Sequence, residues 1–189
     1  MKFRSLSRAL ASVVLGAFLV TAVGGGRIAA APANSDAAAP MLANTATGYA
    51  PSSQECAFLT IINSYRQSKG IAALKMTRIL GASAEHHSVD MAKSGVFSHT
   101  LSTGVTWSQN MTNHGYTFST YRGENIAAGY SLAQDTFNQW KNSPTHNANM
   151  LNGNFKAIGI GQVYNSTSKW KYYWTTNFGG YVDSTMVSC

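Results

Sequence analysis

Acidic residues are scarce in this chain, which has 7 Asp and Glu against 14 Lys and Arg in 189 residues. Few residues are therefore available for a reaction that needs two carboxylates close together. One of the seven, Glu124, lies between a glycine and an asparagine in the stretch YRGENIAAGY. The role of this single carboxylate is the main question that the sequence raises.

No apolar run is long enough for a bilayer-spanning helix. The longest, ALASVVLGAFLVTAV, has 15 residues, whereas a spanning helix needs about 20. It follows Lys2, Arg4 and Arg8, and small residues ending in Ala-Ala-Ala at 29–31 follow it. This pattern is typical of a secretory signal peptide, which we assign to residues 1–31. A retained N-terminal anchor is the alternative. We expect a secreted, extracellular chain that begins near Pro32 and has no transmembrane segment.

Basic residues form no cluster once residues 1–31 are set aside. That segment holds four basic and no acidic residues, which leaves ten basic against seven acidic residues and a net charge of +3. Without a cluster of Lys and Arg, nucleic acid is not an expected partner. The sequence also lacks a phosphate-binding loop and a dinucleotide-binding turn, so no organic cofactor is expected. A surface that is polar but mostly uncharged fits a small extracellular monomer.

Cysteine is limited to two residues, Cys56 and Cys189. Export to an oxidising compartment would allow them to form a disulfide, although spacing alone does not exclude two separate thiols. We favour the bridge because a free terminal thiol in a secreted protein is reactive.

The pattern of residues predicts helices in the first part of the chain. Residues 32–52 show no period and are interpreted as a flexible leader. A capping box at Ser52 and Glu55 opens a helix that Gly70 ends. We expect further helices over 77–94, over 105–114, from a capping box at Ser131 and Gln134 to near Asn142, and from Ser143-Pro144 onward.

The last third of the chain changes to strand-forming residues. FKAIGIGQVY and KWKYYWTTNFGG are rich in β-branched and aromatic residues, and the polar turn NSTS separates them. They are predicted to form an antiparallel hairpin, in which Trp170, Tyr172, Trp174 and Phe178 pack against neighbours. The fold class is α+β, with helices packed on an antiparallel sheet.

Several segments in order carry a resemblance to a known family: HSVDMAKSGVFSHT, RGENIAAGY, NSPTHNANML, FKAIGIGQV and YYWTTNFGG. Together they resemble the CAP superfamily of cysteine-rich secretory, antigen 5 and pathogenesis-related proteins, and more closely its bacterial SCP-like extracellular branch. The resemblance covers residues 53–183 and leaves 184–189 as a C-terminal tail. It implies an α-β-α sandwich around a central antiparallel sheet, with a polar cavity.

The resemblance also implies the residues of that cavity. His99 matches the first cavity histidine, Glu124 the first glutamate and His146 the second histidine, and Asn125 and Ser143 lie at the rim. The eukaryotic pattern adds a second glutamate shortly after a tryptophan. Here the corresponding position, three residues after Trp140, is Ser143, so this chain departs from the family pattern.

The residue types themselves favour a cation site. Two imidazoles and a carboxylate are ligands that zinc or a similar divalent cation accepts, and three protein ligands leave a position for water or substrate. Only the fold can bring them together, since they lie far apart in sequence. Taken without the family, Glu124 could equally accept backbone N–H bonds at a turn before Asn125.

The other three histidines have weaker support. His87 lies on the apolar face of the predicted 77–94 helix, where a hydrogen-bonded core histidine is favoured over a metal ligand. His86 and His114 have no supporting context.

Three functions fit these features. The first is a non-enzymatic module that holds a cation or a small or lipid-like ligand. The second is a metal-dependent hydrolase with Glu124 as general base, and the third is a surface or stress protein that acts through partner contacts. We favour binding because one cavity carboxylate would otherwise have to serve as both metal ligand and base.

Overall fold

The computed structural model of the protein describes residues 48–189. The expected signal peptide and most of the expected leader lie outside these residues. The described part contains, in order, α1 (Ser53–Ser68), β1 (Lys75–Met76), α2 (Arg78–Ser94), α3 (Trp107–Asn113), β2 (Arg122–Ala128), α4 (Ala133–Lys141), α5 (Pro144–Met150), β3 (Ala157–Tyr164) and β4 (Tyr172–Gly179).

The strands form one sheet in the order β1-β3-β4-β2. The predicted hairpin is confirmed, because β3 and β4 pair antiparallel from Ala157 opposite Gly179 to Tyr164 opposite Tyr172. β2 also pairs antiparallel with β4. The sheet is not wholly antiparallel as expected, since the two-residue β1 runs parallel to β3. A connection that passes through helices allows parallel pairing, and two residues are too short to appear as a periodic pattern.

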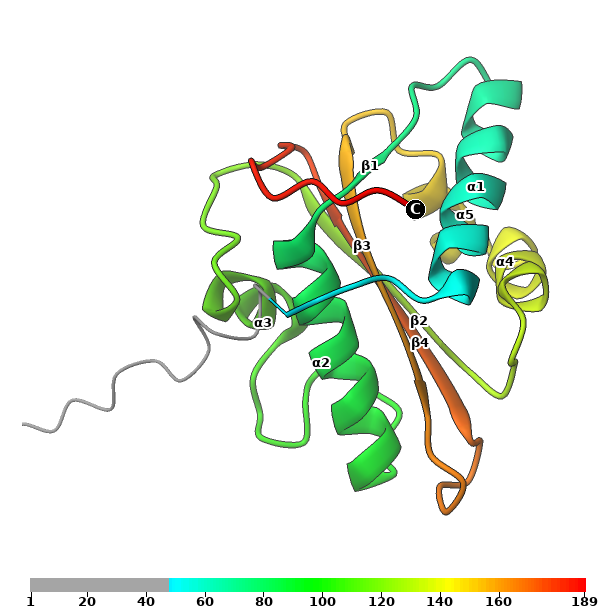
Figure 1. The fold of residues 1–189 in the computed structure, drawn as a ribbon, viewed down its shortest axis with the longest axis vertical. Coiled ribbons are helices and arrows are strands. Elements are labelled where there is room, and N and C mark those ends of the chain that lie inside the picture. The colour runs from blue at the N-terminus through cyan, green and yellow to red at the C-terminus, as the bar shows by residue number, and fades with distance from the viewer. Residues whose placement is uncertain (1–47) are drawn as a thin grey trace, which may run out of the picture. The chain divides into compact units, whose positions relative to one another are not determined.

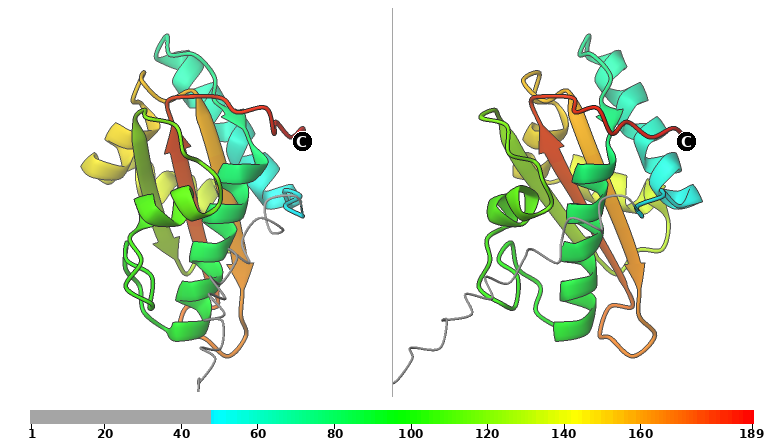
Figure 2. Two further views of the ribbon diagram at one scale, coloured as in Figure 1. Left: turned by 90° about the vertical axis from the view of Figure 1, so that its left-hand side faces the viewer. Right: turned by 60° about the vertical axis from the view of Figure 1, so that its left-hand side comes forward.

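Helices cover both faces of the sheet, which confirms the α+β sandwich. α2 lies on one face, and α1, α4 and α5 lie on the other (Figure 1). The four strands stay side by side as one twisted sheet in the two further views (Figure 2). The expected class is therefore correct, with three layers in the order helix, sheet, helix.

Two glycines let α2 lie directly on the sheet. A Cβ at Gly159 would stand 1.9 Å from the carbonyl carbon of Leu80, and a Cβ at Gly161 would stand 2.3 Å from the backbone nitrogen of Glu85. Both positions belong to β3 and face the backbone of α2. The helix therefore approaches the strand more closely than any larger residue would allow.

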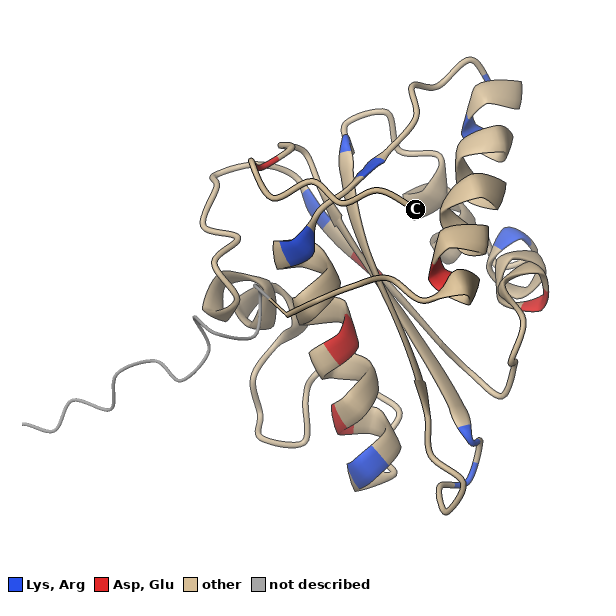
Figure 3. Ribbon diagram, viewed as in Figure 1, with Lys and Arg blue, Asp and Glu red and all other residues tan. Residues whose placement is uncertain are grey.

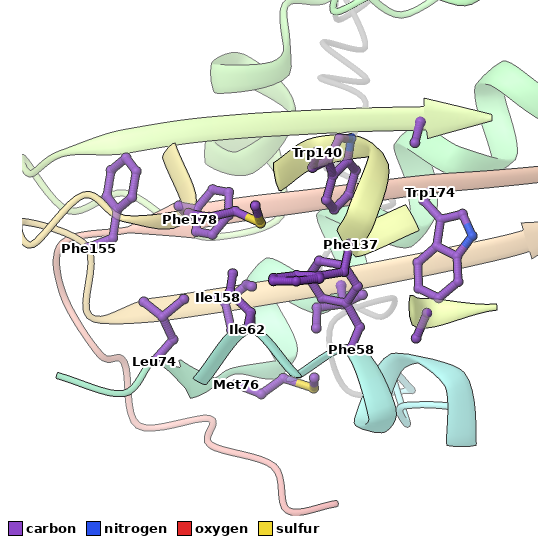
Figure 4. Close-up of a cluster of buried hydrophobic side chains, with 14 of the residues drawn as sticks. Phe58, Ile62, Leu74, Met76, Phe137, Trp140, Phe155, Ile158, Trp174 and Phe178 are labelled. Carbon is purple, nitrogen blue, oxygen red and sulfur yellow. The ribbon is translucent and has the colours of Figure 1, made fainter. Parts of the chain in front are cut away.

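Buried aromatic residues fill the space between the sheet and α1 and α4 (Figure 4). The ring of Phe58 lies 5.2 Å from Trp140 and 6.0 Å from Trp174. The packing role predicted for Trp174 and Phe178 is confirmed, because both are fully buried. Trp170 lies outside β4 and instead packs against the cluster beside α2.

The capping box predicted for α1 is confirmed. Ser52 Oγ accepts from the Glu55 backbone N–H at 3.3 Å, and Glu55 Oε2 accepts from the Ser52 N–H at 2.6 Å. The box predicted for α4 is wrong, because that helix begins at Ala133 with Leu132 as N-cap. The Ala133 N–H donates to Gln54 Oε1 at 2.9 Å. A side chain from α1 thus replaces the local cap.

Two other expected boundaries are corrected, and one strand is added. Tyr49 is 2% exposed and its hydroxyl donates to the carbonyl of Ile160 at 2.6 Å, so the packed domain begins before Ser52. α3 begins at Trp107, because the Thr106 side chain caps it. Residues 122–128 form a strand that the sequence did not predict, since glycine, glutamate and asparagine rarely favour strands.

Arg66 is fully buried and joins α1 to the end of α5. Its guanidinium donates to four carbonyl oxygens, those of Ala72, Met150, Asn152 and Phe155. Burial lowers the pKa of Arg66. The side chain therefore fixes α5, the helix that carries His146, against the rest of the domain.

The disulfide between Cys56 and Cys189 is confirmed, with Cα atoms 5.4 Å apart. Residues 184–189, which were expected to form a tail, also make backbone contacts with the domain. Met186 forms a β-bridge with Thr77, and the Val187 N–H donates to the Met76 carbonyl at 3.1 Å. The chain end is thus a structural part of the fold.

Charged residues are scattered over the described elements rather than gathered in one stripe (Figure 3). None of the helices within residues 48–189 is both long enough and apolar enough to cross a membrane.

Candidate functional site

Glu124 lies in the middle of β2, opposite Asn177 of β4. Its side chain is 1% exposed, and two histidines contact its carboxylate. His99 Nδ1 lies 2.8 Å from Oε1, and His87 Nδ1 lies 2.7 Å from Oε2. The close approach of α2 to the sheet brings His87 to the carboxylate, and His99 comes from the loop that follows α2. Glu124 is therefore not a turn residue, and the predicted contact between it and His99 is present.

His87 is a charged partner of Glu124. Its Nδ1 faces the carboxylate and its Nε2 lies 2.9 Å from the Ser98 carbonyl oxygen. Both partners only accept hydrogen bonds, so both ring nitrogens carry a proton and the ring is an imidazolium. Burial lowers the pKa of His87, but the hydrogen bond and charge of Glu124 outweigh it and the net pKa is raised. His87 is thus a hydrogen-bonded core residue, as expected, and has no free nitrogen for a metal.

Asn177 completes the surroundings of the carboxylate. With its amide nitrogen turned toward Glu124, it donates to Oε2 at 3.0 Å, and its oxygen accepts from Ser83 Oγ and the Ala84 N–H. Both oxygens of Glu124 are therefore engaged by protein donors. The carboxylate orients its neighbours rather than offering a free face to solvent.

His99 and His146 present the accessible part of the site. The His99 side chain is 50% exposed, and because its Nδ1 lies against the Glu124 carboxylate, Nε2 is the ring nitrogen left without a partner among the described residues. His146 is half-buried. Burial, and then the charge of His99, lower the pKa of His146, which favours its neutral form. No direct bond joins His146 to Glu124 within the described residues.

Ser143 orients His146. It occupies the N-cap position of α5 and Pro144 follows at the first helical position, as predicted. Its hydroxyl, however, makes no capping bond and lies 2.8 Å from His146 Nδ1. A neutral hydroxyl thus stands where the family pattern has a second glutamate, and it holds the second histidine without adding negative charge.

Asparagines attach α5 to β2 beneath the site. Asn125 is fully buried rather than at the rim as expected, and it donates to the carbonyl of His146 at 3.0 Å. Asn149 donates to the Glu124 carbonyl at 3.1 Å and to Asn125 Oδ1 at 2.8 Å. Sequence reasoning missed Asn149 and Asn177. Asn149 could have been found from its position three residues after His146, on the same face of a helix.

The residue types at this site, imidazoles beside a carboxylate, are ones that a divalent cation such as zinc accepts. Among residues 48–189, no three His, Cys, Asp or Glu side chains lie close enough together to hold a metal. The predicted three-residue set of His99, Glu124 and His146 is therefore not assembled as direct ligands. Glu124 instead stands behind His99, in the way that carboxylates commonly orient metal-binding histidines. Further ligands to a cation would come from water or a bound molecule.

The ion pair of His87 and Glu124 predicts a pH-dependent stability. The folded pKa of His87 is raised, so its contribution is fully present below the ordinary histidine pKa, about 6.5, and is lost as pH rises through the folded value. Glu124→Gln should cost about 1.5–3 kcal/mol at pH 5.5 and less at pH 8.5. Urea unfolding at both values measures this. Glu85→Gln, at an exposed position of α2, is the control, and an equal loss at both pH values would contradict the ion pair.

The fold and these motifs define a family. Residues 59–178 match the CAP family, the cysteine-rich secretory protein family. The chain therefore belongs to this family, as its sequence indicated. It is 35% identical over 158 residues to the protein YkwD of Bacillus subtilis, an alignment that covers 80% of this chain and 59% of YkwD.

Solved structures have the same fold. An extracellular SCP-domain protein of Bacillus anthracis is 26% identical with a TM-score of 0.57, covering 69% of this chain and 44% of that one. An outer surface protein of Borrelia burgdorferi has a TM-score of 0.59 at 21% identity, covering 65% of this chain and 89% of that one. This chain thus spans less than two thirds of both Bacillus proteins.

Proposed function

We propose that this chain is a secreted CAP-domain module that binds a divalent cation such as zinc through Nε2 of His99 and Nε2 of His146, without catalysing a reaction. The observation that carries the proposal is the bond from His99 Nδ1 to the buried Glu124, which leaves Nε2 exposed. The disulfide, and the extracellular and outer-surface proteins that share the fold, support export. A small ligand with a carboxylate or hydroxyl group could complete the coordination.

Binding is favoured over hydrolysis because of the state of Glu124. A general base must reach the proton that it removes, directly or through one water. The side chain of Glu124 is 1% exposed, and its oxygens already accept from His87 and His99. A bound cation would supply charge and orientation for a ligand, while the buried and paired Glu124 is not positioned to activate water.

Zinc titration calorimetry on metal-free protein tests the proposal. A zinc-binding step at His99 and His146 is expected in the wild type, weakened at least tenfold in His99→Ala and in His146→Ala, because each loses one of two protein ligands. Glu124→Gln should weaken it about 10–100-fold, since the glutamate orients His99. Neutral imidazole is the ligand form, so binding should also weaken as pH falls below about 6.5.

The matched control is His114→Ala, which removes a histidine whose ring bonds to the Asn110 carbonyl and not to Glu124, and which should leave the step at His99 and His146 in place. Circular dichroism checks that each variant keeps its fold. If folded His99→Ala and His146→Ala bind zinc as the wild type does, the cluster around Glu124 is structural and the proposal is wrong.

A further inference from the structure

A second pair of histidines lies apart from the Glu124 cluster. His86 is on α2 and His114 is at the C-cap of α3, and their ring centres are 5.1 Å apart. Both line a cavity of about 290 Å³ together with Tyr49, Glu85 and Val89. Successive helical residues point about 100° apart, so His86 faces this cavity while its neighbour His87 faces Glu124.

One buried residue, Asn110, orients both rings. Its amide nitrogen donates to the Ser83 carbonyl at 2.8 Å, which turns Oδ1 toward His86 Nδ1 at 2.8 Å. Its backbone carbonyl oxygen lies 2.8 Å from His114 Nδ1. Both partners are acceptors, so each Nδ1 carries the proton. In the neutral rings, both Nε2 atoms are therefore unprotonated and can bind a metal.

The Nε2 lone pairs are not used by the protein. Neither atom has a hydrogen-bond partner within residues 48–189, although His114 is only 4% exposed. Burial lowers the pKa of His114, against the opposing effect of its bond to Asn110, and a charge on His86 lowers it further. Both rings line the cavity, and the lowered pKa of His114 favours the neutral form that binds a cation.

The spacing of the rings suits a metal between them. In tetrahedral zinc sites each imidazole nitrogen lies about 2.0–2.1 Å from the ion, which puts two ring centres about 5 Å apart. We propose that His86 and His114 form a second cation site, which takes Zn(II) or another late first-row divalent ion through the two Nε2 atoms. Since no third protein ligand is gathered there among the described residues, water or a small ligand in the cavity completes the coordination.

Asparagine substitutions give a sharp test. In His86→Asn and His114→Asn the side-chain amide stands near the position of Nδ1 and can still donate to Asn110, but Nε2 is removed. The experiment uses the full chain carrying His99→Ala and His146→Ala, so that zinc binding at the proposed first site does not contribute. Zinc is added to this chain, to each asparagine variant in it, and to a control variant, Asn113→Ala, at an exposed neighbour of His114.

Binding is followed by calorimetry and by NMR of the histidine ring nitrogens. One zinc equivalent is expected in the parent chain and in the control, with a shift of both His86 and His114 Nε2. Each asparagine variant should bind at least tenfold more weakly. If the parent chain is folded but binds no zinc, or if folded asparagine variants bind equally well, the proposal is overturned. If His99 and His146 bind no zinc in the wild type, the result expected for His86 and His114 stays the same. The two proposals are therefore tested separately.

Discussion

Gly161→Ala is expected to lower the free energy of unfolding by about 3 kcal/mol or more, at the upper end of the range for overpacked positions. The added Cβ would stand 2.3 Å from the Glu85 backbone nitrogen and 2.5 Å from the Ala84 carbonyl carbon. Backbone atoms cannot rotate aside as a side chain can, so α2 has to move away from β3. That movement would also pull His87 from Glu124, because His87 follows in the same helical turn.

The control for this substitution is Gly153→Ala. A Cβ at Gly153 would have no atom within 4 Å, and replacing glycine there should change stability by less than about 1 kcal/mol. Urea unfolding of both variants and the wild type gives the comparison. NMR of the His87 ring reports whether its bond to Glu124 survives. Equal stability of Gly161→Ala and Gly153→Ala would show that α2 does not need the close approach.

The second large effect is expected from removing the disulfide. Cys56 and Cys189 are separated by 133 residues, and closing a loop of this size restricts the unfolded chain by about 5 kcal/mol in the chain-entropy model. The double variant Cys56→Ser, Cys189→Ser should therefore unfold at a temperature roughly 10–20 °C lower, given about 2–4 °C per kcal/mol for a domain of this size.

Reduced wild-type protein is the matched comparison, because it has the same sequence without the bond. Both forms should keep the helical circular dichroism signal and lose protection of the backbone amides near Val187, whose N–H bonds to β1. A melting temperature within about 2 °C of the oxidised wild type would contradict a stabilising role. The disulfide would then hold the C-terminal end of the chain against α1 without stabilising the fold.

The surroundings of Glu124 explain how this chain departs from its family pattern. A buried carboxylate is stabilised only when it is paired and hydrogen-bonded, and here His87 supplies the opposite charge while Asn177 and His99 donate to it. Ser143 then orients His146 without a second carboxylate. The site therefore presents two oriented imidazoles with little free negative charge.

The sequence by itself determined the features that depend on neighbouring residues. The capping box at Ser52, the left-handed Gly95 that ends α2 and the hairpin of β3 and β4 follow from local geometry. The motif order was specific enough to identify the family and to select His99, Glu124 and His146. Local rules suffice for these features because each depends on residues a few positions apart or on a pattern with a short period.

Only the tertiary structure decided the features that depend on distant residues. β2 is a strand because β4 pairs with it, although its residues are poor strand formers, and α4 begins at Ala133 because Gln54 of α1 accepts its first N–H. His87 became the partner of Glu124 because glycines in β3 let α2 approach the sheet. Such contacts join residues 37 to 79 positions apart. Local propensity does not determine which of these distant buried groups form hydrogen bonds with each other.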